Sequence, residues 1–110
     1  MNALRLAALR ARIDELDRDL VATLAQRQRL VEGVARLKDH PTQVRDPARV
    51  ERVVANVLGA ATTTGLSASI AEPVWRLLCE LCAAHEAAWI EARSGGYRDS
   101  CCGCEDGPRV

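Results

Sequence analysis

Two cationic side chains interrupt an apolar row near the start of the chain. Apolar residues recur at steps of three and four from Leu6 to Leu24, and continuing those steps reaches Arg27 and then Lys38. A cation on a buried face is costly unless it is paired, reaches solvent at its tip, or faces an anionic ligand. Because the two positions are eleven residues apart, they point the same way on a helix and can converge on one small dianion.

A carboxylate lies on a second apolar row, closer to the C-terminus. The row is formed by Trp75, Cys79, Cys82 and Trp89, and Glu86 falls within it. A carboxylate on a buried face is either a structural partner of Arg27 or Lys38, or a group that titrates in the course of function. The spacing alone leaves both interpretations open.

A long first helix is expected over about residues 4–38, where there is no proline. Its apolar row contains Leu6, Leu9, Ile13, Leu16, Leu20, Leu24, Val31 and Val34. At 1.5 Å per residue the helix is about 50 Å long, which exceeds the diameter of roughly 26–30 Å expected of a compact chain of this size. A helix of that length needs a partner along it, so we predict a homodimer.

Two further helices are expected. Asp46 followed by Pro47 predicts an N-cap and first helical position, for a helix over about 47–62 that ends in threonines and Gly65. A third helix is predicted over about 69–93, capped by Ser69 or by Ser67, with Pro73 near its first turn. Residues 39–45 are expected to form a loop. The predicted fold class is all-α, with no strand pattern and no internal repeat.

Composition excludes several classes of protein. Lys+Arg 15 against Asp+Glu 15 gives a net charge of zero, so no long-range field favours nucleic acid or an anionic membrane surface. No stretch approaches the roughly 20 apolar residues of a membrane span, and the N-terminus lacks the apolar run of a signal peptide. With 3% aromatics and no Phe, the core is expected to consist of aliphatic side chains. We expect a cytoplasmic protein.

The cysteines do not form the spaced framework of a secreted disulfide scaffold. They are Cys79, Cys82, Cys101, Cys102 and Cys104, an odd number. Cys79 and Cys82 lie on apolar rows, where Cys is an ordinary small core residue, and we expect no metal there or in the tail. Residues 1–93 are predicted to form the domain and 94–110 a disordered tail. His40 and His85 have no role that the sequence reveals.

The helix order and its charged positions resemble the all-helical chorismate mutases. The similarity covers about Leu4 to Ala92 and is carried by the segments LRARIDELDRDLVATLAQRQRLVEGVARLK and VRDPARVERV, followed by a third amphipathic helix. The resemblance implies an intertwined homodimer with two sites, each lined by both chains. It implies a shikimate-pathway isomerase that converts chorismate to prephenate by a concerted [3,3] rearrangement, as in aromatic amino acid biosynthesis, with no cofactor and no metal.

The resemblance also implies roles for individual residues. Arg10 would reach a substrate carboxylate from the second chain, and Arg27 would hold a carboxylate from within the site. Lys38 would contact a carboxylate and the ether oxygen whose C–O bond breaks. Asp46 would offer backbone contacts near the ring hydroxyl, and Arg49 would orient a nearby group.

Two further positions follow from the same resemblance. Cys82 stands where a small polar residue, often Ser, assists a carboxylate, and Glu86 stands where a Gln commonly donates to the ether oxygen. An ionised Glu86 would repel the negative charge that develops there, so we expect Glu86 to be protonated or to share a proton when substrate is bound. The alternative is a salt bridge from Glu86 to Lys38 in an inactive relic.

One departure from the family concerns the substrate. Family mutases usually carry a Glu directly after the Arg of the second helix to hold the ring hydroxyl, whereas here Arg49 is followed by Val50. Related enzymes with Arg-Val act on chorismate analogues, as isochorismate pyruvate-lyases or 4-amino-4-deoxychorismate mutases. Glu51 is a partial substitute if the helix is shifted. A non-catalytic helical dimer that regulates a shikimate-pathway partner is the competing class, and the cations on a buried face argue against it.

Overall fold

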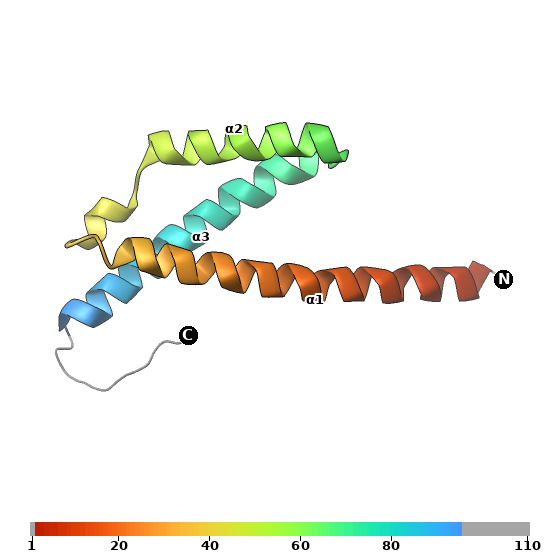
Figure 1. The fold of residues 1–110 in the computed structure, drawn as a ribbon, viewed down its shortest axis with the longest axis horizontal. Helices are drawn as coiled ribbons and strands as arrows, with labels where there is room; N and C mark the ends of the chain where they lie inside the picture. The colour runs from red at the N-terminus through yellow and green to blue at the C-terminus, as the bar shows by residue number, and fades with distance from the viewer. Residues whose placement is uncertain (1, 96–110) are drawn as a thin grey trace. The chain divides into compact units, whose positions relative to one another are not determined.

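The computed structural model describes residues 2–95, and all of its regular elements are helical. In chain order they are α1 (Asn2–Ala35), the 3₁₀ helix η1 (Pro41–Val44), α2 (Pro47–Thr64) and α3 (Ala68–Gly95) (Figure 1). No strand occurs in this range, so the all-α prediction with three main helices is confirmed. The chain divides into two compact units, an N-terminal unit of residues 1–30 and a C-terminal unit of residues 31–110.

The N-terminal unit is one uninterrupted stretch of α1. None of its described side chains is buried, and the predicted apolar row lies exposed to solvent in the single chain. Leu9 is 63% exposed, Ile13 53% and Leu20 56%. Burying such side chains is the main source of stability for a long helix, and this stretch does not bury them. The homodimer stays a prediction, because the structure contains one chain and a dimer interface needs two.

Helix α1 ends at Ala35, before the predicted end at Lys38. The last turn tightens, because the amide of Leu37 donates to the carbonyl of Val34 (3.0 Å) and the amide of Lys38 donates to that of Ala35 (3.1 Å). These are bonds of the 3₁₀ type, which wind the chain more tightly than an α-helix. The prediction that Lys38 shares a helical face with Arg27 eleven residues earlier is therefore wrong.

The predicted loop 39–45 contains the short helix η1, and His40 caps it. His40 is held extended (φ −140°, ψ 142°), as expected before Pro41. Its Nδ1 accepts from the amide of Thr42 (3.3 Å), while Gln43 Oε1 accepts from the amides of His40 (2.9 Å) and Asp39 (2.6 Å). This is a capping box in which histidine replaces the usual serine or threonine. His40 thus has a structural role that the sequence analysis missed.

Helix α2 begins as predicted and ends two residues later than predicted. Asp46 Oδ1 accepts from the amide of Arg49 (3.1 Å) and Pro47 occupies the first turn, which confirms the cap. The helix continues through Thr64, and the three threonine hydroxyls donate to carbonyls four residues back, at 2.9–3.3 Å. Gly65 then ends the helix in the left-handed conformation, with φ 85°.

Helix α3 begins at Ala68, and Ser67 rather than Ser69 supplies the first accepting carbonyl, to the amides of Ile70 (3.0 Å) and Ala71 (2.9 Å). Pro73 lies inside the helix, beyond its first turn. The helix runs through Gly95, two residues past the predicted end at 93. The rest of the predicted tail, including Cys101, Cys102 and Cys104, lies outside the described residues.

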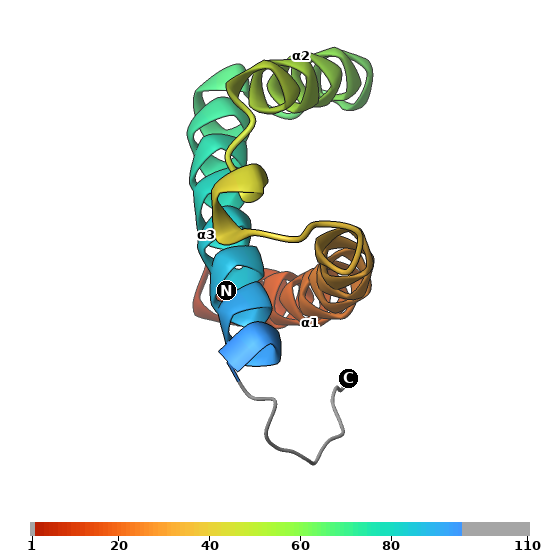
Figure 2. The same ribbon diagram turned by 90° about the vertical axis from the view of Figure 1, so that its left-hand side faces the viewer.

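The C-terminal unit has a small core where the end of α1, η1 and α3 meet. Its buried residues are Ala35, Val44, Ala83 and Ile90, with Ala87 and Trp89 packed against them. Helix η1 lies beside α3 (Figure 2), and α2 packs on α3 after the turn at Gly65 (Figure 1). This core therefore fixes α3 against the segment that carries Lys38. None of the helices within residues 2–95 is both long and apolar enough to cross a membrane.

Candidate active site

Lys38 and Glu86 form an ion pair between the segment after α1 and the middle of α3. Lys38 Nζ donates to Glu86 Oε1 at 3.2 Å, and the two side chains are 23% and 12% exposed. Within residues 2–93, whose side chains are described, Glu86 is the only charged residue that is buried. The structure therefore gives the carboxylate on the buried row of α3 a partner, Lys38.

The pair leaves capacity for an anionic ligand. An ammonium group has three N–H donors, and the bond to Glu86 uses one of them. In a partly desolvated setting a carboxylate or a developing oxyanion gains more from such a donor than it would in water. Glu86 can accept from Lys38 when ionised, or donate one hydrogen bond when protonated. The arrangement can therefore bind an anion at Lys38, beside the carboxyl group of Glu86.

A second set of contacts holds the main chain at Lys38. Arg93 Nη2 donates to the carbonyl of Lys38 at 2.9 Å. The guanidinium groups of Arg93 and Arg36 lie 5.1 and 5.6 Å from the ring centroid of Trp89, within the range of cation–π attraction. The sequence analysis missed these residues. The spacing of Trp89 and Arg93, one helical turn apart, is the signal that was present.

A further contact links α3 to the last turn of α1. His85 Nε2 donates to Glu32 Oε2 at 2.6 Å, with the histidine half exposed and the carboxylate mostly covered. His85 directly precedes Glu86, so this bridge ties the same stretch of α3 to the end of α1. The sequence assigned His85 no role, and no local spacing could have revealed a partner 53 positions away.

The other predicted site residues lie on α1, at the start of α2 and on α3. Arg10 is exposed and Arg27 half-buried, both in the N-terminal unit. Asp46 uses its side chain to cap α2, and Arg49 is exposed in the first turn of that helix. Cys82 is half-buried and lies four residues before Glu86 on α3.

Glu51, the possible substitute for the missing family carboxylate, is already engaged by Arg76 on α3. Its two oxygens accept from Arg76 Nη1 (2.8 Å) and Nη2 (3.0 Å), and these hydrogen bonds together with the positive charge lower the pKa of Glu51. Val50 is half-buried. Arg49 is thus followed by a packing residue and then by a carboxylate that ties α2 to α3.

The described part of the chain contains no cluster of side chains that could bind a metal ion. Within residues 2–95 there is no group of three or more His, Cys, Asp or Glu side chains that could hold an ion. Cys79 and Cys82 are half-buried on α3 and form no disulfide with each other.

Comparison with known proteins supplies the family. The model of the chorismate mutase type II family matches residues 9–87, a segment that includes both Lys38 and Glu86. Comparisons with curated proteins and with solved structures gave no match. The matched segment is most of the 110-residue chain and contains all of the predicted site residues. The chain therefore belongs to the chorismate mutase type II family, a family of all-helical isomerases.

Proposed function

We propose that this protein converts chorismate to prephenate by a concerted [3,3] rearrangement, without cofactor or metal. The observation that carries the proposal is the family match over residues 9–87, which includes Lys38 and Glu86. The ion pair between these two side chains at 3.2 Å is also what the inactive-relic alternative predicts, so turnover has to decide between them. A pericyclic reaction needs no nucleophile and no base. It needs the substrate held in a folded conformer, and donors aimed at the ether oxygen where negative charge builds up.

Lys38 is proposed as the group that meets the ether oxygen and one substrate carboxylate. Arg10, Arg27 and Arg49 are proposed to hold carboxylates and orient the ring, with Asp46 and Cys82 as further contacts. The family resemblance supports these roles, and the free donors of the Lys38 ammonium support its own.

The proposed enzyme is an intertwined homodimer in which Arg10 of one chain serves the site of the other. The apolar row of residues 2–30, which is exposed in the single chain, supports this assembly. We propose residues 1–93 as the domain. We also propose a cytoplasmic location, because the odd set of five cysteines does not resemble a secreted disulfide scaffold.

Glu86 is proposed to take up a proton when substrate binds. The dianion competes for Lys38 and adds negative charge beside Glu86, and a like charge nearby favours the neutral carboxylic acid. The protonated group then donates to the ether oxygen. Turnover is expected to weaken as pH rises, because an ionised Glu86 no longer donates.

The pH profile of the Glu86→Gln variant tests this role. An amide donates at every pH, so the variant is expected to flatten the alkaline loss. Glu80→Gln is the matched control, since Glu80 is an exposed carboxylate on the same helix, paired with Arg45. Wild-type turnover that does not fall at alkaline pH, or a Glu86→Gln variant that falls as the wild type does, contradicts the role of Glu86.

A chorismate analogue is the second candidate substrate. Val50 replaces the family carboxylate that holds the ring hydroxyl, and Glu51 is held by Arg76. A pocket without that carboxylate contact is what favours 4-amino-4-deoxychorismate, or a lyase reaction on isochorismate. The shared feature of the three substrates is a dianion with a breakable ether bond.

Product identification decides among these activities. The purified protein is incubated separately with chorismate, 4-amino-4-deoxychorismate and isochorismate, and products are identified by NMR and mass spectrometry. Lys38→Ala serves as the control for contaminating activity. Prephenate from chorismate supports the proposal, and a rearranged product from the amino analogue alone supports the second candidate. Turnover of none of the three sinks the enzyme proposal in favour of a helical dimer that regulates a pathway partner.

A further inference from the structure

Lys38 does not lie on a helix, and its backbone needs another support. It follows the end of α1 at Ala35, and its amide is held by one bond of the 3₁₀ type, to the carbonyl of Ala35. A lysine side chain has four rotatable carbon–carbon bonds, so the position of its ammonium depends on a fixed backbone as well as on its partner. In the free protein that partner is Glu86.

The backbone support is the guanidinium of Arg93. It donates to the carbonyl of Lys38 at 2.9 Å and lies 5.1 Å from the ring centroid of Trp89. Trp89 packs against the core cluster of Ala35, Val44, Ala83 and Ile90, so the ring is a fixed platform. The guanidinium of Arg36 lies over the same ring at 5.6 Å. The segment Arg36–Lys38 is thus held at both ends by one helical turn of α3.

The two tethers of Lys38 respond differently to substrate. An anionic ligand competes with Glu86 for the ammonium, so the side-chain tether weakens when the site fills. The bond from Arg93 goes to a main-chain carbonyl, which the substrate does not use. Once substrate has drawn the ammonium away from Glu86, the Arg93 contact is what keeps the base of the lysine side chain in place.

We propose that Arg93 is a positioning residue that fixes the main chain at Lys38, so that the ammonium stays aligned with the breaking bond. This inference rests on the proposed function. A misplacement of a reacting group by about 1 Å can cost on the order of 100-fold in rate. The cost falls on kcat rather than KM, because the proposed arginines still bind the substrate carboxylates when Arg93 is absent.

The test compares Arg93→Ala and Arg93→Lys with the wild type. Lysine keeps the charge and a donor for the carbonyl, although it lacks the planar guanidinium that stacks on an indole ring. Arg52→Ala is the matched control, since Arg52 is an exposed arginine of α2 that makes no ion pair within the described residues. Each variant is measured for kcat and KM with the substrate that the wild type accepts, and for native-state hydrogen exchange at the amides of Leu37 and Lys38.

We expect Arg93→Ala to lower kcat by about 10-fold to 100-fold while KM changes less than about 3-fold. Arg93→Lys should recover most of kcat, and Arg52→Ala should match the wild type. In Arg93→Ala the Lys38 amide should exchange about 10-fold faster, because its opening becomes easier.

Several results overturn the inference. Unchanged kcat in Arg93→Ala does so, and so does a loss that Arg93→Lys shares in full. If Arg93→Ala raises KM by about 10-fold to 100-fold and leaves kcat unchanged, Arg93 contributes to substrate binding instead. If the wild type turns over none of the substrates, the proposed function fails, and the exchange rate of the Lys38 amide alone then decides whether Arg93 anchors this segment.

Discussion

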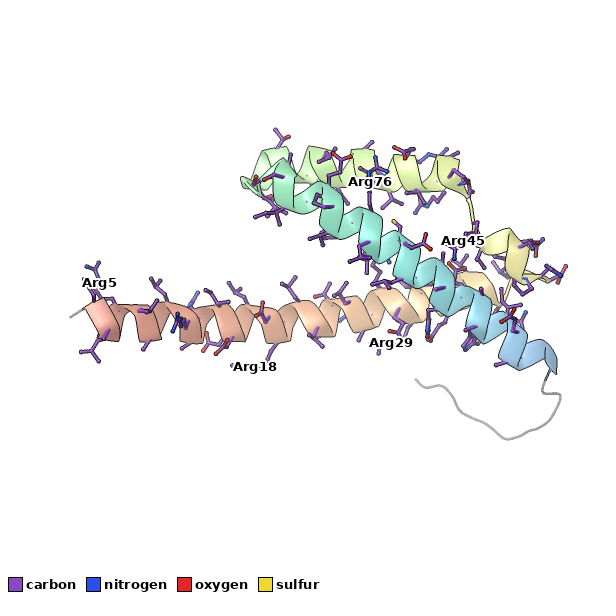
Figure 3. The ribbon with its side chains drawn as sticks, turned by 180° about the vertical axis from the view of Figure 1, so that it is seen from behind. Arg5, Arg18, Arg29, Arg45 and Arg76 are labelled. Carbon is purple, nitrogen blue, oxygen red and sulfur yellow. The ribbon has the colours of Figure 1, made fainter. Side chains whose placement is uncertain are left out.

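The C-terminal unit buries a small core and forms ion pairs, although it leaves Leu37, Leu77 and Leu81 exposed, whereas the N-terminal unit has no buried side chain among its described residues. In residues 2–30 the large apolar side chains are exposed, and Arg5, Arg18 and Arg29 make no ion pair among the described residues (Figure 3). In residues 31–93 three lysine or arginine side chains form ion pairs with carboxylates, whereas Arg52 forms none. The pairs are Lys38–Glu86, Arg45–Glu80, and Arg76 with both Glu51 and Glu72.

This difference separates what one chain can complete from what it cannot. The C-terminal unit buries a small core, and the one buried carboxylate among residues 31–93, that of Glu86, has Lys38 as its partner. The N-terminal unit has an apolar row that is exposed to water. Each side chain of this row that stays exposed lacks the stabilisation that burial would give. The two units should therefore respond differently to mutation and to protein concentration.

The largest expected effect is that of Leu20→Asp in the N-terminal unit. Leu20 lies in the exposed apolar row of α1, and a dimer would bury two copies of it. Burial of a leucine is worth roughly 1.5–3 kcal/mol, so the proposed dimer should lose at least about 3–6 kcal/mol. Light scattering should show monomers, and circular dichroism should show reduced helix content.

The matched control for that variant is Ala22→Asp. Ala22 is exposed and lies about 200° around the helix from Leu20. Its substitution by Asp therefore adds the same charge on the opposite face. This variant should remain a dimer. A Leu20→Asp protein that keeps the wild-type mass in solution would show that the exposed row is not the surface that a second chain covers.

The next largest effect is expected for substitution of Lys38 in the C-terminal unit. Lys38→Ala should lower kcat by about 10²-fold to 10³-fold, the cost of losing one donor at a developing oxyanion. Arg45→Ala removes an exposed, paired cation of the same unit and should leave kcat within about 3-fold of the wild type. Steady-state kinetics measures both. A Lys38→Ala enzyme as active as Arg45→Ala would remove Lys38 from the reaction.

The sequence predicted the end of a helix correctly where that end is set by a contact between neighbouring residues. Asp46 and Pro47 fixed the start of α2, because a cap needs only its neighbours. The end of α1 was predicted three residues late, since the tightened turn at Lys38 depends on packing against α3. Helix α2 runs through the three threonines despite their low helix propensity and ends at Gly65, because a weak local preference does not by itself stop a helix and a left-handed glycine does.

The sequence predicted those residues of the site that are charged and lie on an otherwise apolar row. Lys38 and Glu86 stood out because a charged residue on a buried face is costly and needs a partner. Arg93 left no such trace, because it acts on a main-chain carbonyl 55 positions away. Glu32 and His85 are likewise distant in sequence and meet only through the fold. Contacts of this kind depend on tertiary structure that spacing does not encode.

A smaller effect is expected in the core of the C-terminal unit. Ile90 is fully buried, and Ile90→Ala should cost about 2–4 kcal/mol in the free energy of unfolding, against about 0.5–1.5 kcal/mol for Ile90→Val. Because the cluster lies within one chain, the loss measured by urea unfolding should be similar at low and high protein concentration. A loss that grows on dilution would place Ile90 in the contact between chains.

The smallest expected effect is at the exposed pairs of Arg76, where α2 meets α3. Arg76 lowers the pKa of Glu51, chiefly by its hydrogen bond, so the contribution of this pair to stability is present above the ordinary pKa of a glutamate. It is lost as pH falls through the lowered pKa. Arg76→Ala should therefore be slightly less stable than the wild type at pH 7, and the difference should disappear well below about pH 4.

Urea midpoints at pH 7 and at strongly acidic pH measure the Arg76 effect, with Arg52→Ala as the control that shows no difference at either pH. Salt screens charges at this exposed site, so about 1 M salt should also shrink the difference. A deficit of Arg76→Ala that persists in acid would come from lost packing of the arginine stem rather than from its charge. In that case pairing of exposed charges would not be what sets the C-terminal unit apart, and the comparison would rest on Glu86 and the core beside it.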